Sequence, residues 1–211
     1  MSATDRLPWD VLLIGGPSGV GKSTSAKHLA RQYVLPWVQV DDLRLTLQAS
    51  QVRLPDPEDT RRLYFFDSPD VWTMSPEYVL DGFIGIGKIL SPAIAKVITN
   101  HLATAEPIIL EGDGLLPSLL TRADIQEWDP NGRVRAVMVA PPDEKTILRN
   151  MLARGRGIPG QSESDLRRNS RANWLYGTWL VAEARRFGVP VVDSEPLVSL
   201  SDRIATACAS I

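Results

Sequence analysis

An eight-residue glycine-rich pattern near the N-terminus constrains this chain more than any other feature. The residues Gly16-Pro17-Ser18-Gly19-Val20-Gly21-Lys22-Ser23 match G-x-x-x-x-G-K-[ST] without a mismatch. An apolar run at residues 11–14 precedes the pattern and indicates a buried strand, and residues 22–33 have the periodicity of a helix. A strand, a glycine-rich turn and a helix in this order form the context that a phosphate-binding loop requires.

The residue types in this loop suit a nucleoside triphosphate. Glycines let the backbone N–H groups turn toward phosphates, next to the positive end of a helix dipole. We expect Lys22 to reach the β- and γ-phosphates and to act in catalysis, and Ser23 to ligate Mg²⁺. The expected ATP-binding residues are Gly16, Pro17, Ser18, Gly19, Val20, Gly21, Lys22, Ser23 and Thr24.

A second match to the glycine spacing begins at Gly82. Its glycines recur at Gly85 and Gly87 before Lys88, but Ile89 replaces the hydroxyl that would bind magnesium. The segment also lies within a helical pattern rather than after a strand. We therefore interpret these glycines as packing positions in a helix.

Five short apolar runs, separated by helical patterns, indicate the fold class. The expected strands cover residues 11–14, 37–40, 107–110, 134–139 and 189–193. Strands that alternate with helices predict an α/β protein with a parallel sheet. Together with the loop, the pattern predicts a P-loop NTPase fold, with one domain over residues 1–211.

The stretch between the second and third expected strands is too long for one crossover. We interpret roughly residues 50–105 as a helical insertion that binds the substrate. Val79, Phe83 and Leu90 follow a helical period, after which Ser91 is expected to cap a second helix that starts with Pro92.

Composition excludes several classes of protein. With 44% hydrophobic and 23% charged residues the chain is not disordered, and its net charge of −2 makes a nucleic-acid partner unlikely. The single cysteine, Cys208, fits a reducing compartment. No unbroken apolar run has the length of a membrane span, and the N-terminus does not resemble a signal peptide. We expect a cytoplasmic protein without membrane association, and its oligomeric state stays open.

The rest of the chain favours a kinase among proteins that bind nucleotides. The guanine-reading tetrapeptide Asn-Lys-x-Asp of switch GTPases does not occur. Asp41 follows the second expected strand, at the sheet edge where parallel sheets hold ligands, and is the expected catalytic base. Arg44 lies one helical turn further and is expected to bind an anionic group of the acceptor.

Two more groups complete the expected site. Arg149 and Arg154, with Arg156, belong to a lid over about residues 149–168 and would stabilise the transferred phosphoryl group; Arg154 would also bind ATP. After the third expected strand, Glu111, Gly112 and Asp113 are expected to contact the acceptor, and Glu111 also to hold Mg²⁺.

These residues resemble those of P-loop small-molecule kinases related to polynucleotide kinases, shikimate kinases and zeta toxins. In polynucleotide kinases the residues at the positions of Asp41 and Arg44 activate the acceptor hydroxyl and hold its phosphate. A longer resemblance is to the kinase domain of 2-phosphoglycerate kinase, through residues 14–24, 108–112, 116–117 and 187–191. It implies the same fold and the roles given above for Lys22, Ser23, Asp41 and Glu111.

The chain departs from that family after its third expected strand. The family tends to read Glu-Gly-Val-His-Leu-Val-Pro there, whereas this chain has Gly114 at the position of the histidine and an additional acid at Asp113. Both changes disfavour a phosphorylated acceptor.

The sequence therefore predicts ATP- and Mg²⁺-dependent phosphorylation of a small molecule, at a hydroxyl group. Two alternatives stay open: a polynucleotide 5′-hydroxyl kinase, and a regulatory protein that binds ATP and a partner protein.

Overall fold

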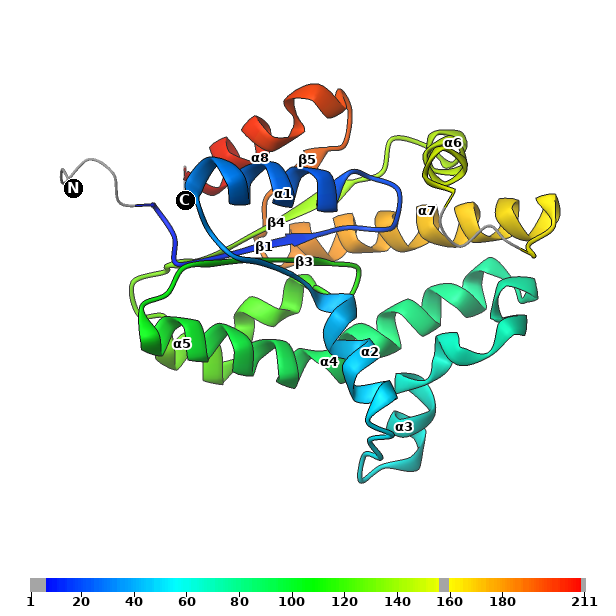
Figure 1. The fold of residues 1–211 in the computed structure, drawn as a ribbon, viewed down its shortest axis with the longest axis horizontal. Coiled ribbons are helices and arrows are strands. Elements are labelled where there is room, and N and C mark those ends of the chain that lie inside the picture. Colours follow the sequence, from blue (N-terminus) through cyan, green and yellow to red (C-terminus); the bar gives the residue numbers. More distant parts are fainter. Residues whose placement is uncertain (1–6, 156–159, 210–211) are drawn as a thin grey trace.

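A five-stranded parallel sheet lies between two layers of helices in the computed structural model, which describes residues 7–155 and 160–209 (Figure 1). The sheet has the order β2-β3-β1-β4-β5, which confirms the predicted class. The strands are β1 (Val11–Gly15), β2 (Trp37–Gln39), β3 (Ile108–Gly112), β4 (Val134–Ala140) and β5 (Val191–Asp193). Their ends differ from the expected ones by one or two residues.

Helices cover both faces of the sheet, as crossovers between parallel strands require. Helices α1 (Lys22–Tyr33) and α8 (Leu200–Ala209) lie on one face, and α4 (Pro76–Thr104), α5 (Ala123–Trp128) and α7 (Glu163–Arg186) on the other (Figure 1). The remaining helices are α2 (Val40–Ala49), α3 (Pro57–Leu63) and α6 (Glu144–Arg154). The described residues also contain the 3₁₀ turns η1 (Phe65–Asp67), η2 (Pro69–Thr73), η3 (Pro117–Thr121) and η4 (Leu197–Ser199).

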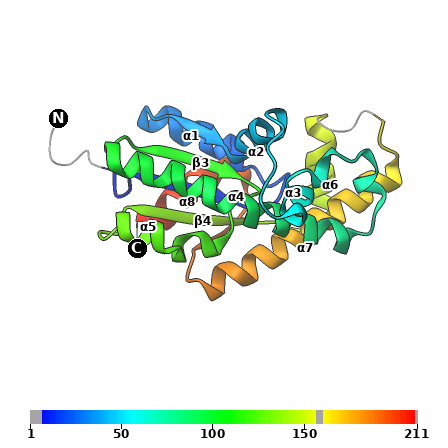
Figure 2. The ribbon, with the colours of Figure 1, turned by 90° about the horizontal axis from the view of Figure 1, so that it is seen from below.

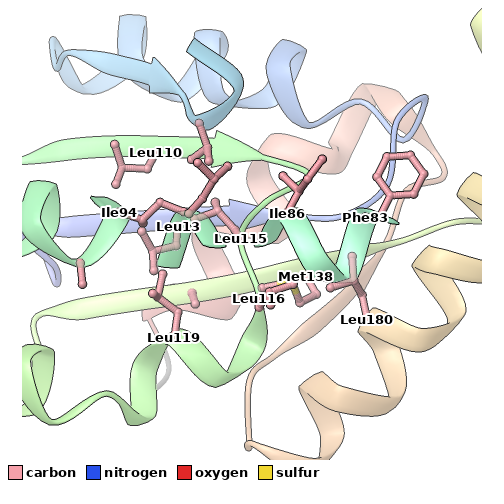
Figure 3. Close-up of a cluster of buried hydrophobic side chains, with 14 of the residues drawn as sticks. Leu13, Phe83, Ile86, Ile94, Leu110, Leu115, Leu116, Leu119, Met138 and Leu180 are labelled. Carbon is pink, nitrogen blue, oxygen red and sulfur yellow. The ribbon is translucent and has the colours of Figure 1, made fainter. Parts of the chain in front are cut away.

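The strands read as continuous apolar runs because both sheet faces are buried. Along β1, Leu13 points into the cluster beneath α4 and α7, whereas Leu12 and Ile14 point into the cluster beneath α1 and α8. Figure 3 shows Leu13, Leu110 and other side chains of the first cluster, among them Ile94 from α4. This two-sided packing holds the carboxyl ends of the strands in fixed positions.

Helix α4 corrects one expectation, because it continues through Pro92 instead of starting anew there. Ser91 is therefore not an N-cap; its hydroxyl donates to the carbonyl of Gly87 at 2.7 Å. An internal proline costs a helix about 3 kcal/mol. Burial of Leu90 and Ile94, on either side of the proline, in the same core offsets that cost and keeps the helix continuous.

Helix α4 is also apolar and long enough to cross a membrane by length and composition, with a mean hydropathy of 1.4 over 18 residues. It contains no unbroken apolar run of that length, and 56% of the window is buried inside the protein. Figure 2 shows it running along the sheet, so we assign it as a core helix.

Two of the three glycines in the second sequence match, Gly82 and Gly87, are packing positions, as predicted. A Cβ atom on Gly82 would lie 2.1 Å from the ring of Phe65, and one on Gly87 would lie 2.7 Å from Leu116. Both glycines therefore let side chains from other segments contact the α4 backbone.

Candidate active site

The phosphate loop begins where β1 ends and leads directly into α1. Gly16, Gly19 and Gly21 have φ angles of 144°, 87° and 91°, which side-chain-bearing residues rarely adopt. A Cβ atom on Gly16 would also lie 2.7 Å from the carbonyl oxygen of Val139. The glycine spacing that defines the sequence pattern is thus required by the backbone itself.

Residues of α7 contact the phosphate loop and hold it in place. The backbone N–H of Ser18 donates to Oδ1 of Asn173 at 3.0 Å, and the amide of Asn173 donates to Oδ1 of Asn169 at 2.7 Å. Gly177 lets the helix approach Pro17, since a Cβ atom there would lie 2.7 Å from the proline ring. Asn150 of α6 holds the other side of the loop through the carbonyl of Gly19, at 2.9 Å.

The sequence did not reveal these asparagines because they lie more than a hundred residues after the loop. One signal was available. Asn169 and Asn173 are four residues apart on the buried face of an amphipathic helix, where polar side chains need partners.

Lys22 is held in place by two oxygen atoms. Its Nζ donates to the carbonyl of Pro17 at 2.7 Å and to Oδ1 of Asp113 at 2.6 Å. The lysine side chain is only 6% exposed, so its charge is compensated inside the protein by Asp113.

Glu111 lies beside the loop because of the sheet register. It pairs with Ile14 of β1 on one side and with Gln39 of β2 on the other. Burial raises the pKa of the Glu111 carboxyl, while Lys22 and a hydrogen bond from Ser23 act in the opposite direction. A carboxylate and a hydroxyl are thus adjacent at the start of α1.

These two oxygen ligands suit magnesium. Mg²⁺ keeps several waters and takes one or two side chains together with phosphate oxygens. In the described part of the chain no cluster of three or more His, Cys, Asp or Glu that could hold a metal occurs. Ser23 and Glu111 are therefore the residues that would hold the ion.

Asp41 and Arg44 lie on the first turns of α2, directly after β2. Nε of Arg44 is 3.8 Å from Oδ1 of Asp41, as expected for residues one turn apart. The guanidinium also donates to Oε1 of Gln48 at 3.2 Å and lies over the ring of Phe66, 5.8 Å from its centroid. These contacts orient both side chains at the carboxyl end of the sheet.

A cavity of about 520 Å³ brings together eight of the sixteen predicted site residues. Its lining includes Ser18, Lys22, Ser23, Asp41, Arg44, Glu111, Asp113 and Arg154. The phosphate loop, the strand-end acids and one arginine of the expected lid therefore face one space.

Other predicted residues lie outside this lining. Gly112 packs against Val40, because a Cβ atom there would lie 2.9 Å from that side chain, and it does not line the cavity. Arg149 pairs with Glu195 at 3.2 Å, and both side chains are largely exposed. Thr24 is exposed on α1. Arg156 lies outside the described residues.

Aromatic residues of the predicted insertion form part of the cavity wall. Phe66, Trp72 and Phe83 come from η1, η2 and α4. The rings of Phe66 and Trp72 are stacked at 5.2 Å, and Phe83 stacks on buried Tyr176 at 4.9 Å. The hydroxyl of Tyr176 donates to the carbonyl of Asp113, and burial raises the pKa of this tyrosine well above its usual value. Sequence reasoning missed this wall because isolated aromatic residues resemble ordinary core residues.

The chain is similar in sequence to known kinases. No protein family model matches the chain. It is 25% identical over 198 residues to 2-phosphoglycerate kinase of Methanocaldococcus jannaschii, covering 92% of this chain and 61% of that enzyme. It is 26% identical over 156 residues to a guanylate kinase of Streptomyces coelicolor, covering 70% and 68% of the two chains. The chain thus spans less than two thirds of the 2-phosphoglycerate kinase.

A gluconokinase from Sinorhizobium meliloti superposes with a TM-score of 0.52 at 18% identity, over 97% of this chain and 93% of that structure. The chain has the fold of the P-loop kinases. The predicted fold and the predicted resemblance to P-loop small-molecule kinases are therefore confirmed.

Proposed function

We propose that this P-loop kinase fold transfers the γ-phosphoryl group of ATP to a hydroxyl group of a small molecule, as its resemblance to 2-phosphoglycerate kinase suggests. One observation carries the proposal. A phosphate loop with its lysine and a strand-end carboxylate, Asp41, line the same cavity. A phosphoryl donor and a proton acceptor are the two groups that phosphorylation of an alcohol requires.

The roles follow from position and charge. The hydroxyl oxygen of the acceptor bonds to the γ-phosphorus, the bond from that phosphorus to ADP breaks, and the hydroxyl proton passes to Asp41. Lys22 and Arg154 neutralise the charge on the transferred group, and Arg149 joins them once it leaves Glu195. Ser23 and Glu111 would hold magnesium, whose positive charge would offset that of the phosphates.

The two other functions are less well supported. A polynucleotide would bring many phosphates to a cavity lined by four carboxylates, those of Asp41, Asp67, Glu111 and Asp113. A regulator that binds only ATP needs no acceptor base, and so leaves the position of Asp41 unexplained.

Release of ADP from Mg·ATP across a panel of acceptors tests the proposal. The panel contains phosphoglycerates, sugars, nucleosides, amino-alcohol antibiotics and a 5′-hydroxyl oligonucleotide. We expect one small molecule to raise ADP release well above its basal rate, with a phosphorylated product. A response to the oligonucleotide alone, or a flat panel with nucleotide binding intact, would contradict the proposal.

Two variants test the assigned roles. Lys22→Ala should abolish transfer, and Asp41→Asn should lower it by about 10²–10⁴-fold while ATP still binds. Asp42→Asn is the matched control, because the neighbouring acid is exposed and does not line the cavity. A fully active Asp41→Asn enzyme would rule out Asp41 as the base.

A further inference from the structure

The wall that the predicted insertion contributes to the cavity is mostly apolar. Its apolar side chains come from η1, η2 and α4 and are Phe66, Trp72, Phe83, Ile86 and Leu90, and Leu45 of the preceding α2 also lines the cavity. Phe83, Ile86 and Leu90 are almost fully buried and already pack in the core. Leu45 is exposed and Phe66 and Trp72 are half-buried, so an acceptor that is polar over its whole surface would leave these three without an apolar partner. Ligand sites match apolar walls with apolar parts of the ligand and use a few polar groups for orientation.

The aromatic side chains of this wall pack against one another and against Tyr176. Phe66 contacts Trp72 and Phe83, with ring centroids 5.2 Å and 4.9 Å away, and Phe83 stacks on Tyr176, whose side chain is fully buried. Because each ring is fixed by another, the wall cannot fold away from a polar ligand. The contacts between the rings therefore fix the shape of the wall.

The charges available to the acceptor are also limited. Under the proposed function, Lys22 and Arg154 face the phosphates of the nucleotide, which leaves Arg44 as the cation for the acceptor among the described lining residues. Arg44 already lies 3.8 Å from Asp41. The carboxylate of Asp67 adds a further negative charge to the lining. A phosphorylated acid would meet more carboxylates than cations.

At position 114 this chain has a glycine and therefore no basic side chain. Gly114 lines the cavity, and a Cβ atom there would lie 3.3 Å from both Leu90 and Val40. The packing therefore restricts side chains at the position where the 2-phosphoglycerate kinase pattern has a histidine.

From this wall and this charge balance we infer that the acceptor is an alcohol that carries a compact apolar group and no phosphate, with Trp72 and Ile86 as specificity-determining residues. The inference rests on the proposed function. The hydroxyl would face Asp41, and the apolar group would pack on Trp72, Phe83 and Ile86.

Matched pairs of alcohols test this inference by binding in the presence of Mg·ADP, measured by calorimetry. The pairs are phenylalaninol with alaninol, 3-phenylpropanol with propanol, and adenosine with ribose; 2-phosphoglycerate and glycerate form the phosphate pair. We expect the member with the aromatic ring, called ring-bearing below, to bind at least tenfold more tightly in each of the first three pairs, and 2-phosphoglycerate to bind no better than glycerate. Equal affinities within the ring pairs, or tighter binding of 2-phosphoglycerate than of every ring-bearing alcohol, would overturn the inference.

Two substitutions test whether the tighter binding of ring-bearing alcohols depends on the wall. Trp72→Leu and Ile86→Ala should each weaken binding of the ring-bearing alcohols about fivefold to tenfold, with ADP affinity unchanged as evidence of folding. Trp128→Leu is the control, because this half-exposed tryptophan on α5 does not line the cavity. An equal loss with all three variants, or no loss with either wall variant, would contradict the assignment.

Transfer, followed by ³¹P NMR with Mg·ATP, separates this inference from the proposed function. Tight binding of ring-bearing alcohols without transfer of phosphate to any acceptor would overturn the kinase proposal and leave the ligand class of the cavity intact. Transfer to 2-phosphoglycerate alone would support the kinase and overturn the inference.

Discussion

Nζ of Lys22 lies 2.6 Å from Oδ1 of Asp113, so a carboxylate from the segment after β3 pairs with the lysine of the phosphate loop. Under the proposed function the same ammonium must contact the phosphates of ATP. Two anions therefore compete for one cation. The carboxylate compensates the charge of the buried lysine and holds its side chain in place, at a cost in nucleotide affinity.

Asp113→Asn should consequently bind Mg·ADP more tightly, by about fivefold, or about 1 kcal/mol, because the competing charge is gone. Calorimetric titration with Mg·ADP measures the change. Asp67→Asn is the control: it removes a carboxylate from the same cavity that makes no ion pair with Lys22. An unchanged or weaker affinity for Asp113→Asn would show that Asp113 does not compete with phosphate.

Asn173→Ala should loosen the phosphate loop, because the N–H of Ser18 loses its acceptor. We expect the free energy of unfolding to fall by about 1–2 kcal/mol and ADP affinity to fall severalfold. Urea denaturation and ADP titration measure the two effects. Thr178→Ala, on an exposed face of the same helix, should change neither. Stability lost with full ADP affinity would mean that Asn173 has no part in nucleotide binding.

Two glycines of α4 give opposite predictions. Gly82→Ala should destabilise the protein by about 1–3 kcal/mol, since its methyl group would overlap the Phe65 ring. Gly85→Ala should be neutral or stabilising by up to about 1 kcal/mol, since the methyl group would meet Arg62 at an ordinary 3.4 Å and alanine favours helix. Thermal melting of both variants measures the difference in stability. An equal change in melting temperature would contradict the assignment of Gly82 as a packing position.

The thiol of Cys208 should make stability fall at alkaline pH. Burial raises its pKa from 9.0 to about 12. The unfolded chain therefore loses this proton above about pH 9 while the folded chain keeps it, and the contribution is absent well below pH 9. Between pH 8 and pH 10 the wild-type protein should lose about 1.4 kcal/mol more than Cys208→Ala in urea denaturation. Parallel pH profiles of the two proteins would show that the thiol titrates normally in the folded state.

The sheet and the phosphate loop were predictable because their causes are local. Continuous apolar runs reveal strands buried on both faces, and the glycines at positions 16, 19 and 21 reveal a backbone that needs their φ angles. Arg44 could be placed relative to Asp41 because one helical turn separates them.

What escaped prediction depends on contacts between distant segments. Asn173 reaches Ser18 across 155 residues, and the aromatic wall brings together η1, η2, α4 and α7. The break expected at Ser91 failed for a related reason. A local capping signal was outweighed by the burial of α4 along its whole length in the core.

The unbroken course of α4 limits how substrates can be selected. Phe83 and Ile86, which line the cavity, stand on the same helix as Ile94 and Ile98, which are anchored in the core. Because side chains on both sides of Pro92 pack in the same core, moving the cavity wall would disturb the packing under the sheet. Under the proposed function, that side of the cavity would therefore select acceptors by their shape rather than by closing around them.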